Sequence, residues 1–568
     1  MLRRFGFGRS SSLEAQLAKP NVKLDDLLED TDQLLQEVHL QNARLISFLR
    51  QPAVLSQLVN YIVSERIRGT TTNTVTTTTN GTKPKYTNGT KKSTTHTTTT
   101  TTISENNKNG KEENTKKKNN NNNNNEESHV YVACEILAAG VPALMDGLVY
   151  SHPELLTVLW ALLDQTCKLT PRQMAGFCKV NAILLQRRTG DLVHFIESHQ
   201  DIVAKWLHHI FAYHGEGVPY LSDLLIALIQ CESLPEGNGI GQWLADHGLL
   251  TLLVDRLQPH LEPLNHEIAQ QMLCDVIFSS HISSPLIAEL TSLVTMKRLA
   301  GYMLDLTAPH APNVFICGTG VIRGIRQYCE KIIHNTLEDP THLFSHALQT
   351  FTERLGDLMD LLDSPRSCKA EKDQRLGLER LAILELLMEL LYCSSVATGE
   401  KGIQLAMEYR QAVIHHNALI RCLDLFFAFP QNNILHNTVY ALIRDILLRE
   451  PVRPIVLTED KLIIEVLIRG RLMERILDTY DATRQGKEKK PGYIGHLALL
   501  SNDIQRALED IYQPELKEYL HQKEETKVLL ERWIAHHDLL CQEMKQKMTY
   551  NNEAVFWSVS RYQEHVNL

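Results

Sequence analysis

Helical apolar periodicity runs through most of the chain and restricts it to folds built from many short helices. Between residues 131 and 186, apolar residues recur at steps of three and four, as at Leu155, Leu156, Leu159 and Leu163. This is the period of one helix face rather than of a strand. The same pattern continues, with short breaks, to about residue 513. We therefore predict helices of ordinary length joined by loops of a few residues.

Several helix boundaries are also visible in the sequence. Ser151 to Glu154 has the spacing of a capping box, in which a hydroxyl and a carboxylate satisfy free backbone N–H groups. Thr170 to Gln173 repeats this spacing, with Pro171 at the first helical position, where a missing N–H costs nothing. Gly140 and Gly190 are predicted helix ends, because glycine adopts the left-handed conformation that often follows a helix.

The length of the chain favours a stack of helices over one compact core. With 568 residues, a compact domain would normally split, whereas an elongated stack avoids that limit because each unit contacts only its neighbours. Residues 378–392 are apolar almost all round, apart from three glutamates, which indicates a helix covered on both sides. No clean repeat consensus is present. We predict an all-α, irregular HEAT/armadillo-like helical solenoid with a disordered insertion.

The predicted insertion, residues 70–128, is rich in threonine, asparagine and lysine. It holds nine lysines and five glutamates and so carries a net charge of +4. Because the whole chain carries −9, the rest of the chain carries −13. Too few apolar groups are present to offset chain entropy, which predicts disorder. A neutral low-complexity expansion and a modifiable or partner-binding loop both remain open. The predicted divisions are an N-terminal helical part at 1–69, the insertion at 70–128, the solenoid at 129–513 and a C-terminal helical segment at 514–568.

Composition sets expectations for compartment and partners. The eleven cysteines are scattered without a CxxC pair, which is typical of reduced thiols in a cytosolic protein. No run of eighteen apolar residues occurs, so we expect no transmembrane segment. A net charge of −9 argues against a nucleic-acid partner, which requires a basic face.

The sequence offers no complete catalytic or metal-binding motif. Gly318, Gly320 and Gly324 resemble a dinucleotide turn, but the spacing is one residue too long and no alternating strands surround them. His342 and His346 share a helical spacing, but a zinc site needs a third ligand. No nucleophile elbow, phosphate loop or kinase signature is present. We expect a protein that is not an enzyme, with no catalytic residue, no metal and no cofactor.

Two polar stretches stand out between strongly apolar helices, at residues 426–436 and 491–497. In the first, Leu435 shares a helical face with apolar residues that follow it, whereas Asn432, Asn433 and His436 occupy the helix start. Such side chains can cap the helix, or they can anchor a partner together with nearby aromatic residues. Capping with internal packing only is the alternative, and both hypotheses remain open.

These stretches belong to a set of six short motifs that occur in one order along the chain. The motifs are Arg4-Phe5-Gly6, an acidic leucine-rich segment from Leu24 to Asp30, Cys134-Glu135-Ile136-Leu137, Gln431 to His436, Leu472 to Leu477, and Gly492-Tyr493-Ile494-Gly495-His496-Leu497. With them, the chain resembles the SAPS family, the regulatory subunits of protein phosphatase 6 class (yeast Sit4-type) Ser/Thr phosphatases. The resemblance covers residues 1–69 and about 129–550.

The resemblance implies a non-catalytic scaffold that binds the catalytic subunit of a protein phosphatase 6 class enzyme and directs its substrate choice or location. It implies partner-binding roles for Asn432, Asn433, His436, Tyr493 and His496. We expect a cytoplasmic protein, with the nucleus as a second location and further scaffold proteins as additional partners. A helical-repeat adaptor of another class, such as a trafficking or transport scaffold, is the alternative function.

Overall fold

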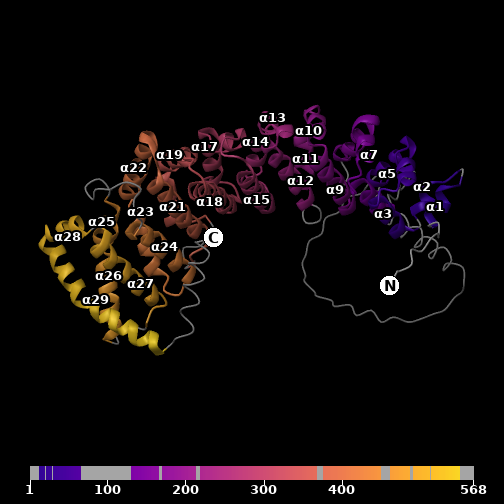
Figure 1. Cartoon of the computed structure of the whole chain (residues 1–568). Helices are drawn as coiled ribbons and strands as arrows, with labels where there is room; N and C mark the ends of the chain where they lie inside the picture. Colours follow the sequence, from indigo (N-terminus) through magenta and orange to yellow (C-terminus); the bar gives the residue numbers. More distant parts are fainter. Residues whose placement is uncertain are drawn as a thin grey trace, which may run out of the picture. The chain divides into compact units, whose positions relative to one another are not determined.

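The computed structural model contains only helices in the part of the chain that it describes, as predicted (Figure 1). It describes residues 12–19, 21–28, 30–64, 129–165, 169–212, 218–366, 375–448, 461–485, 490–511 and 513–550. The predicted disordered insertion therefore lies outside the described residues. The chain forms two compact units, Met1–Ala227 and Leu228–Leu568. The division between them falls within one helix, Val218–Gln230.

The first unit consists of short helices that pack through leucine, tryptophan and phenylalanine side chains. Its elements are α1 Ser12–Leu17, α2 Leu24–Leu28, α3 Thr31–His39, α4 Ala43–Leu49, α5 Pro52–Val63, a helix over 129–138, α7 Pro142–Asp146, η1 Gly147–Ser151, α8 Glu154–Trp160, η2 Ala161–Asp164, α9 Pro171–Arg187, α10 Thr189–Glu197, α11 Ile202–Ala212 and α12 Val218–Gln230, which continues into the second unit. Trp160 lies in the core, with ring centroids 5.0 Å from Phe177 and 5.4 Å from Trp206. Its indole N–H donates to the buried Asn181 amide oxygen at 2.9 Å, so the polar group remains satisfied.

The predicted helix boundaries in this unit have mixed outcomes. The capping box at Thr170 is confirmed in full, and Pro171 opens α9. The box at Ser151 is wrong, because the π-helical turn η1 continues through Ser151 and α8 begins only at Glu154. Gly140 follows a helix with a left-handed φ of 71°. Gly190 does not end a helix, because the chain turns at Arg188 and Gly190 lies in the first turn of α10.

The second unit contains the longer helices of the chain. Its elements are η3 Cys231–Ser233, η4 Pro235–Gly237, α13 Ile240–Asp246, α14 Leu249–Asp255, α15 Pro263–Ser279, α16 Pro285–Leu290, α17 Leu293–Met303, α18 Ala311–Asn335, η5 Thr341–Phe344, α19 Ser345–Glu353, α20 Leu355–Asp363, α21 Leu378–Val396, α22 Gly399–His415, α23 Ala418–Ala428, α24 Asn433–Leu448, α25 Leu462–Ile464, η6 Glu465–Arg469, α26 Leu472–Arg484, α27 Ile494–Arg506, η7 Ala507–Ile511, α28 Gln513–His521 and α29 Glu524–Tyr550. The elements η1, η6 and η7 are π-helical, and η2 to η5 are 3₁₀-helical.

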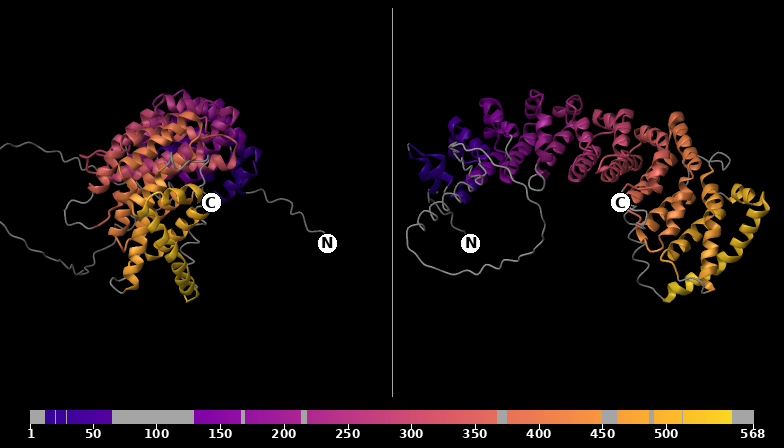
Figure 2. Two further views of the ribbon diagram at one scale, coloured as in Figure 1. Left: turned by 90° about the vertical axis from the view of Figure 1, so that its left-hand side faces the viewer. Right: turned by 180° about the vertical axis from the view of Figure 1, so that it is seen from behind.

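Five helices of this unit form a continuous row, in which α15 packs on α18, α18 on α21, α21 on α24 and α24 on α27. A second row contains α17, α19 and α22, packed in that order, and α22 contacts α23. The view from behind shows the colours of these helices following one another in sequence order (Figure 2). Helix α21 lies within the first row and contacts α19, α20 and α22 as well, which explains why its sequence is apolar on nearly every side.

The glycines of α18 serve helix packing rather than nucleotide binding. A Cβ atom at Gly318 would lie 2.5 Å from the Met303 sulfur, and one at Gly320 would lie 2.4 Å from the Gln270 amide nitrogen. A Cβ atom at Gly324 would lie 3.1 Å from the Cys274 sulfur. The glycines therefore let α15 and α17 approach the α18 backbone closely. All three lie inside one helix, so no strand presents them to a phosphate.

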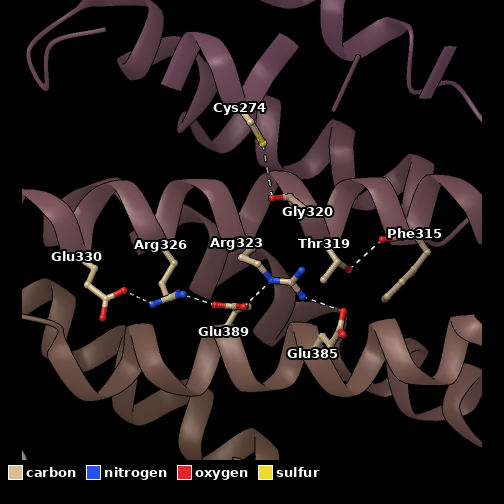
Figure 3. A network of polar contacts seen from close by, with 9 residues as sticks. All are labelled: Cys274, Phe315, Thr319, Gly320, Arg323, Arg326, Glu330, Glu385 and Glu389. Carbon is tan, nitrogen blue, oxygen red and sulfur yellow. Dashed lines mark hydrogen bonds and ion pairs between the residues drawn. The ribbon is translucent and has the colours of Figure 1, made fainter. Parts of the chain in front are cut away.

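A network of ion pairs joins α18 to α21 (Figure 3). The Glu389 side chain is only 4% exposed and lies between two guanidinium groups. Arg323 donates to Glu389 and to Glu385, each at 2.8 Å, and Arg326 lies 2.6 Å from the second Glu389 oxygen. Arg326 also pairs with Glu330 one turn along α18. Two charged residues of α18 thus hold one buried carboxylate of α21, which fixes how far the helices can slide.

No single helix among the described residues is long and apolar enough to cross a membrane. The helices over 129–138 and 142–151 meet that test of length and composition only as a pair, and they are bent by 99° at the break between them.

We expect Glu389→Gln to destabilise the second unit by about 2 to 3 kcal/mol, because two guanidinium groups would lose a buried partner. This is less than the ~3–5 kcal/mol of a fully buried pair, since Arg323 is one-third exposed. Thermal melting of the full chain, with amide hydrogen exchange in α18 and α21, measures the change. The matched control Glu385→Gln removes a carboxylate that is 30% exposed and is expected to cost less than about 1 kcal/mol. Equal losses in the two variants would contradict the role given to Glu389.

Candidate functional site

The two polar stretches singled out in the sequence lie against each other in the second unit. The first forms the turn between α23 and α24, and the second immediately precedes and begins α27. The Gly492 backbone N–H donates to the Pro430 carbonyl oxygen at 3.0 Å. A Cβ atom at Gly492 would lie 2.6 Å from that oxygen, so the close approach of the two backbones requires glycine at this position.

Beneath this backbone contact lies an aromatic cluster, which consists of Phe426, Phe427, His436, Tyr493 and His496. The Phe426 ring centroid lies 5.2 Å from Phe427, 4.7 Å from His436 and 5.1 Å from Tyr493. The two imidazole centroids are 5.5 Å apart. Most of these pairs are tilted or edge-to-face, which is the favourable arrangement for aromatic rings. The cluster joins α23, α24 and α27 into one site.

His436 lies inside the cluster rather than on the surface. Its side chain is fully buried, and its Nε2 atom lies 3.2 Å from the Phe426 carbonyl oxygen, which identifies Nε2 as the protonated nitrogen. Burial lowers the pKa of His436, so the imidazole stays neutral. The expectation that His436 caps free backbone N–H groups or reaches outward is not met. It is spaced three and seven residues before the buried Val439 and Ile443, so helical periodicity turns it inward.

His496 occupies the outer edge of the cluster and is half-buried. Its Nε2 atom lies 2.7 Å from the amide oxygen of the exposed Asn437. Burial, and to a smaller extent the neighbouring His436, lower the pKa of His496 to about 4. Both imidazoles are therefore neutral at physiological pH and present N–H donors without positive charge.

The rim of the site is polar and exposed. Asn432 accepts a hydrogen bond from the Leu435 backbone N–H at 3.1 Å. It therefore caps α24, as the capping hypothesis predicted for this residue. Asn433 is exposed, and the Ile434 side chain is 65% exposed. Leu435 is buried as predicted. The structure thus leaves Asn433 on the surface, whereas Tyr493 is buried.

Sequence reasoning did not include two side chains that complete the site. Arg475 of α26 stacks over the Phe427 ring at 5.3 Å and pairs with Asp424 at 2.6 Å. Tyr440 lies one turn beyond His436 on α24, with its ring centroid 6.2 Å from His496. The four-residue spacing from His436 to Tyr440 could have placed Tyr440 on the same face of the helix. The sequence near the two stretches does not indicate that Arg475 of α26 packs against them.

The site has the character of a contact surface. Among the described residues, no group of three or more histidine, cysteine, aspartate or glutamate side chains is placed to hold a metal ion. His342 and His346 do not face each other, because their Nδ1 atoms lie 3.2 Å from the Asp339 carbonyl and 3.0 Å from the Thr291 carbonyl. A rigid aromatic floor with amide, imidazole and apolar groups at its rim is typical of a protein-binding surface.

We expect Gly492→Ala to lower the melting temperature, because the added methyl group would separate the two stretches that build the site. The matched control is Gly495→Ala, three residues further on in α27. A Cβ atom at Gly495 meets nothing within 4 Å, and alanine favours a helix more than glycine by about 1 kcal/mol. Thermal melting of both variants checks this, and a Gly492→Ala protein as stable as Gly495→Ala would show that the contact is not required.

We also expect the site to lose stability as pH falls from 7 to 5. The folded-state pKa of His496 lies below its unfolded value of about 6.5, so the unfolded chain binds more protons in this window. The raised pKa of Asp503 acts in the opposite direction, because there the folded chain binds the proton more tightly than the unfolded chain. His496→Gln, whose side-chain amide can still donate to Asn437, is expected to melt with a smaller pH dependence. An unchanged pH dependence in this variant would contradict the assignment.

Comparison with known proteins identifies the family to which the chain is similar. The family model described as SIT4 phosphatase-associated protein matches residues 181–547, which include both stretches of the site. Serine/threonine-protein phosphatase 6 regulatory subunit 1 of Mus musculus is 26% identical over 552 residues, covering 89% of this chain and 55% of the relative. SIT4-associating protein SAP190 of Saccharomyces cerevisiae is 26% identical over 419 residues, covering 66% and 40%.

Extragenic suppressor of kinetochore protein 1 of Schizosaccharomyces pombe is 27% identical over 457 residues, covering 73% of this chain and 48% of the relative. The chain thus spans about half the length of these relatives. No solved structure matches it. Because the family model covers more than half of the chain, the protein belongs to the SAPS family of SIT4 phosphatase-associated proteins.

Proposed function

We propose that this chain is a non-catalytic regulatory subunit that binds the catalytic subunit of a protein phosphatase 6 class Ser/Thr phosphatase and directs its substrate choice or location. The support is family membership, together with relatives named as phosphatase 6 regulatory subunits and SIT4-associating proteins. The observation that carries the proposal is the convergence of the 426–436 and 491–497 stretches, which meet at Pro430 and Gly492, into one surface.

Within this proposal, the residues of the site have different roles. Asn433 and the neighbouring Ile434 are exposed and make direct contact with the phosphatase. His496 is half-buried and contributes its edge through Asn437. His436 and Tyr493 are buried, so they position the rim from below, and Asn432 fixes the start of α24. A rigid floor reduces the entropy lost on binding, which favours affinity.

The chain is proposed to act in the cytoplasm and the nucleus, with further scaffold proteins as additional partners. Imaging of the tagged chain tests the location. Co-purification tests the main alternative, a helical-repeat adaptor of another class, because only a phosphatase subunit should retain the catalytic subunit as a stoichiometric partner.

We expect Asn433→Ala to reduce capture of the phosphatase catalytic subunit about tenfold, with an unchanged melting temperature. The Asn433 side chain is exposed at the rim, so its loss removes a contact without disturbing the fold. Pull-down with purified catalytic subunit and thermal melting measure the two effects. The matched variant is Asn432→Ala, which removes the cap of α24 and is expected to cost about 1 kcal/mol of stability.

Failure of the unaltered chain to retain a phosphatase catalytic subunit would overturn the proposed function. Full retention by Asn433→Ala would instead move the docking surface elsewhere while leaving the function in place.

A further inference from the structure

The seam between α24 and α27 continues beyond the aromatic cluster into a second group of polar side chains. It consists of Tyr440 and Arg444 on α24 and Asp503 and Arg506 on α27. Tyr440 links the two groups, because its ring lies 6.2 Å from His496 and its hydroxyl interacts with the Asp503 carboxylate. Arg444 and Arg506 both act electrostatically on Tyr440 and on Asp503, so the four side chains form one local cluster.

The carboxylate in this group is a weak counterion for the two arginines. Asp503 is only 7% exposed, and its Oδ2 atom has no hydrogen-bond partner. The nearest Arg444 nitrogen, Nε, lies 3.9 Å from that oxygen, which is too far for a hydrogen bond. Burial raises the pKa of Asp503, consistent with incomplete compensation of its charge.

The arginines themselves are accessible. The Arg444 side chain is 45% exposed, and Arg506 is exposed and forms no ion pair with any carboxylate that the structure describes. Neighbouring arginines differ in this respect. Arg475 pairs with Asp424 at 2.6 Å, and Arg532 donates to Asp481 at 2.8 Å. The two arginines at 444 and 506 thus face one distant, buried carboxylate, so the group carries a net positive charge beside the aromatic cluster, in a chain whose net charge is −9.

We propose that Arg444 and Arg506 extend the docking surface and bind an acidic side chain of the phosphatase catalytic subunit. This inference rests on the proposed function, and it adds the chemistry of the contact. A guanidinium group presents a planar fork of N–H donors that matches a carboxylate, and it is more weakly hydrated than an ammonium group. The imidazoles of His436 and His496 are neutral and Asp503 is buried. A carboxylate that approaches the rim therefore meets the two positive charges of Arg444 and Arg506.

The test is capture of purified phosphatase catalytic subunit by the full chain across a range of salt concentrations. We expect the double variant Arg444→Gln with Arg506→Gln to bind about tenfold more weakly at low salt, because the electrostatic attraction is lost. Its binding should also depend less on salt than that of the unaltered chain, since fewer charge contacts are screened. The matched control is Arg187→Gln in the first unit, which removes an exposed arginine that pairs with no carboxylate among the described residues.

Thermal melting of each variant confirms that the fold is kept, and Arg506→Gln alone serves if the double variant does not fold. Equal binding and equal salt dependence in the unaltered and double-variant chains would overturn this inference and leave the proposed function intact. No capture by the unaltered chain would overturn both. Loss of binding to RNA or to anionic vesicles, with phosphatase capture unchanged, would assign the arginines to another partner and overturn the inference as well.

Discussion

The five helices α15, α18, α21, α24 and α27 each depend on burying an apolar face against the neighbouring helix of their row. The clearest case is α21, which is apolar on nearly all sides and would be insoluble alone. Contact with α18, α24 and the second row removes that surface from water, and hydrophobic burial is the dominant favourable term in folding. The functional surface follows from the same constraint, because packing of α24 on α27 is what brings the two distant stretches together.

A structural feature of this chain could be predicted from the sequence where it is determined by residues close together along the chain. Helix type, the start of α9 and the inward face of Leu435 were predicted correctly, because each rests on spacing within a few residues. The Ser151 cap failed for a different reason. A π-helical turn absorbs the residue, and nothing in the adjacent sequence distinguishes that turn from a regular helix end.

The candidate site shows the same division. The two stretches were recognised separately, and their contact through Pro430 and Gly492 could not be read from either one, because it depends on the packing of three helices. The depth of His436 was likewise missed, although its spacing from Val439 and Ile443 carries the information. Tyr493 and His496 remain predictions as partner-binding residues, and their accessibility differs, because Tyr493 is buried and His496 is half-buried.

The ion pairs between α18 and α21 have a mechanical consequence. Apolar packing is non-directional, so it opposes separation of two helices more strongly than it fixes their position along their axes. The hydrogen bond from Arg323 to Glu389, together with the ion pair between Arg326 and Glu389, opposes displacement along the helix axes. Under a force that slides α18 along α21, this junction should therefore resist displacement more than a junction held by leucines alone. The stiffness of the row would then vary from one junction to the next.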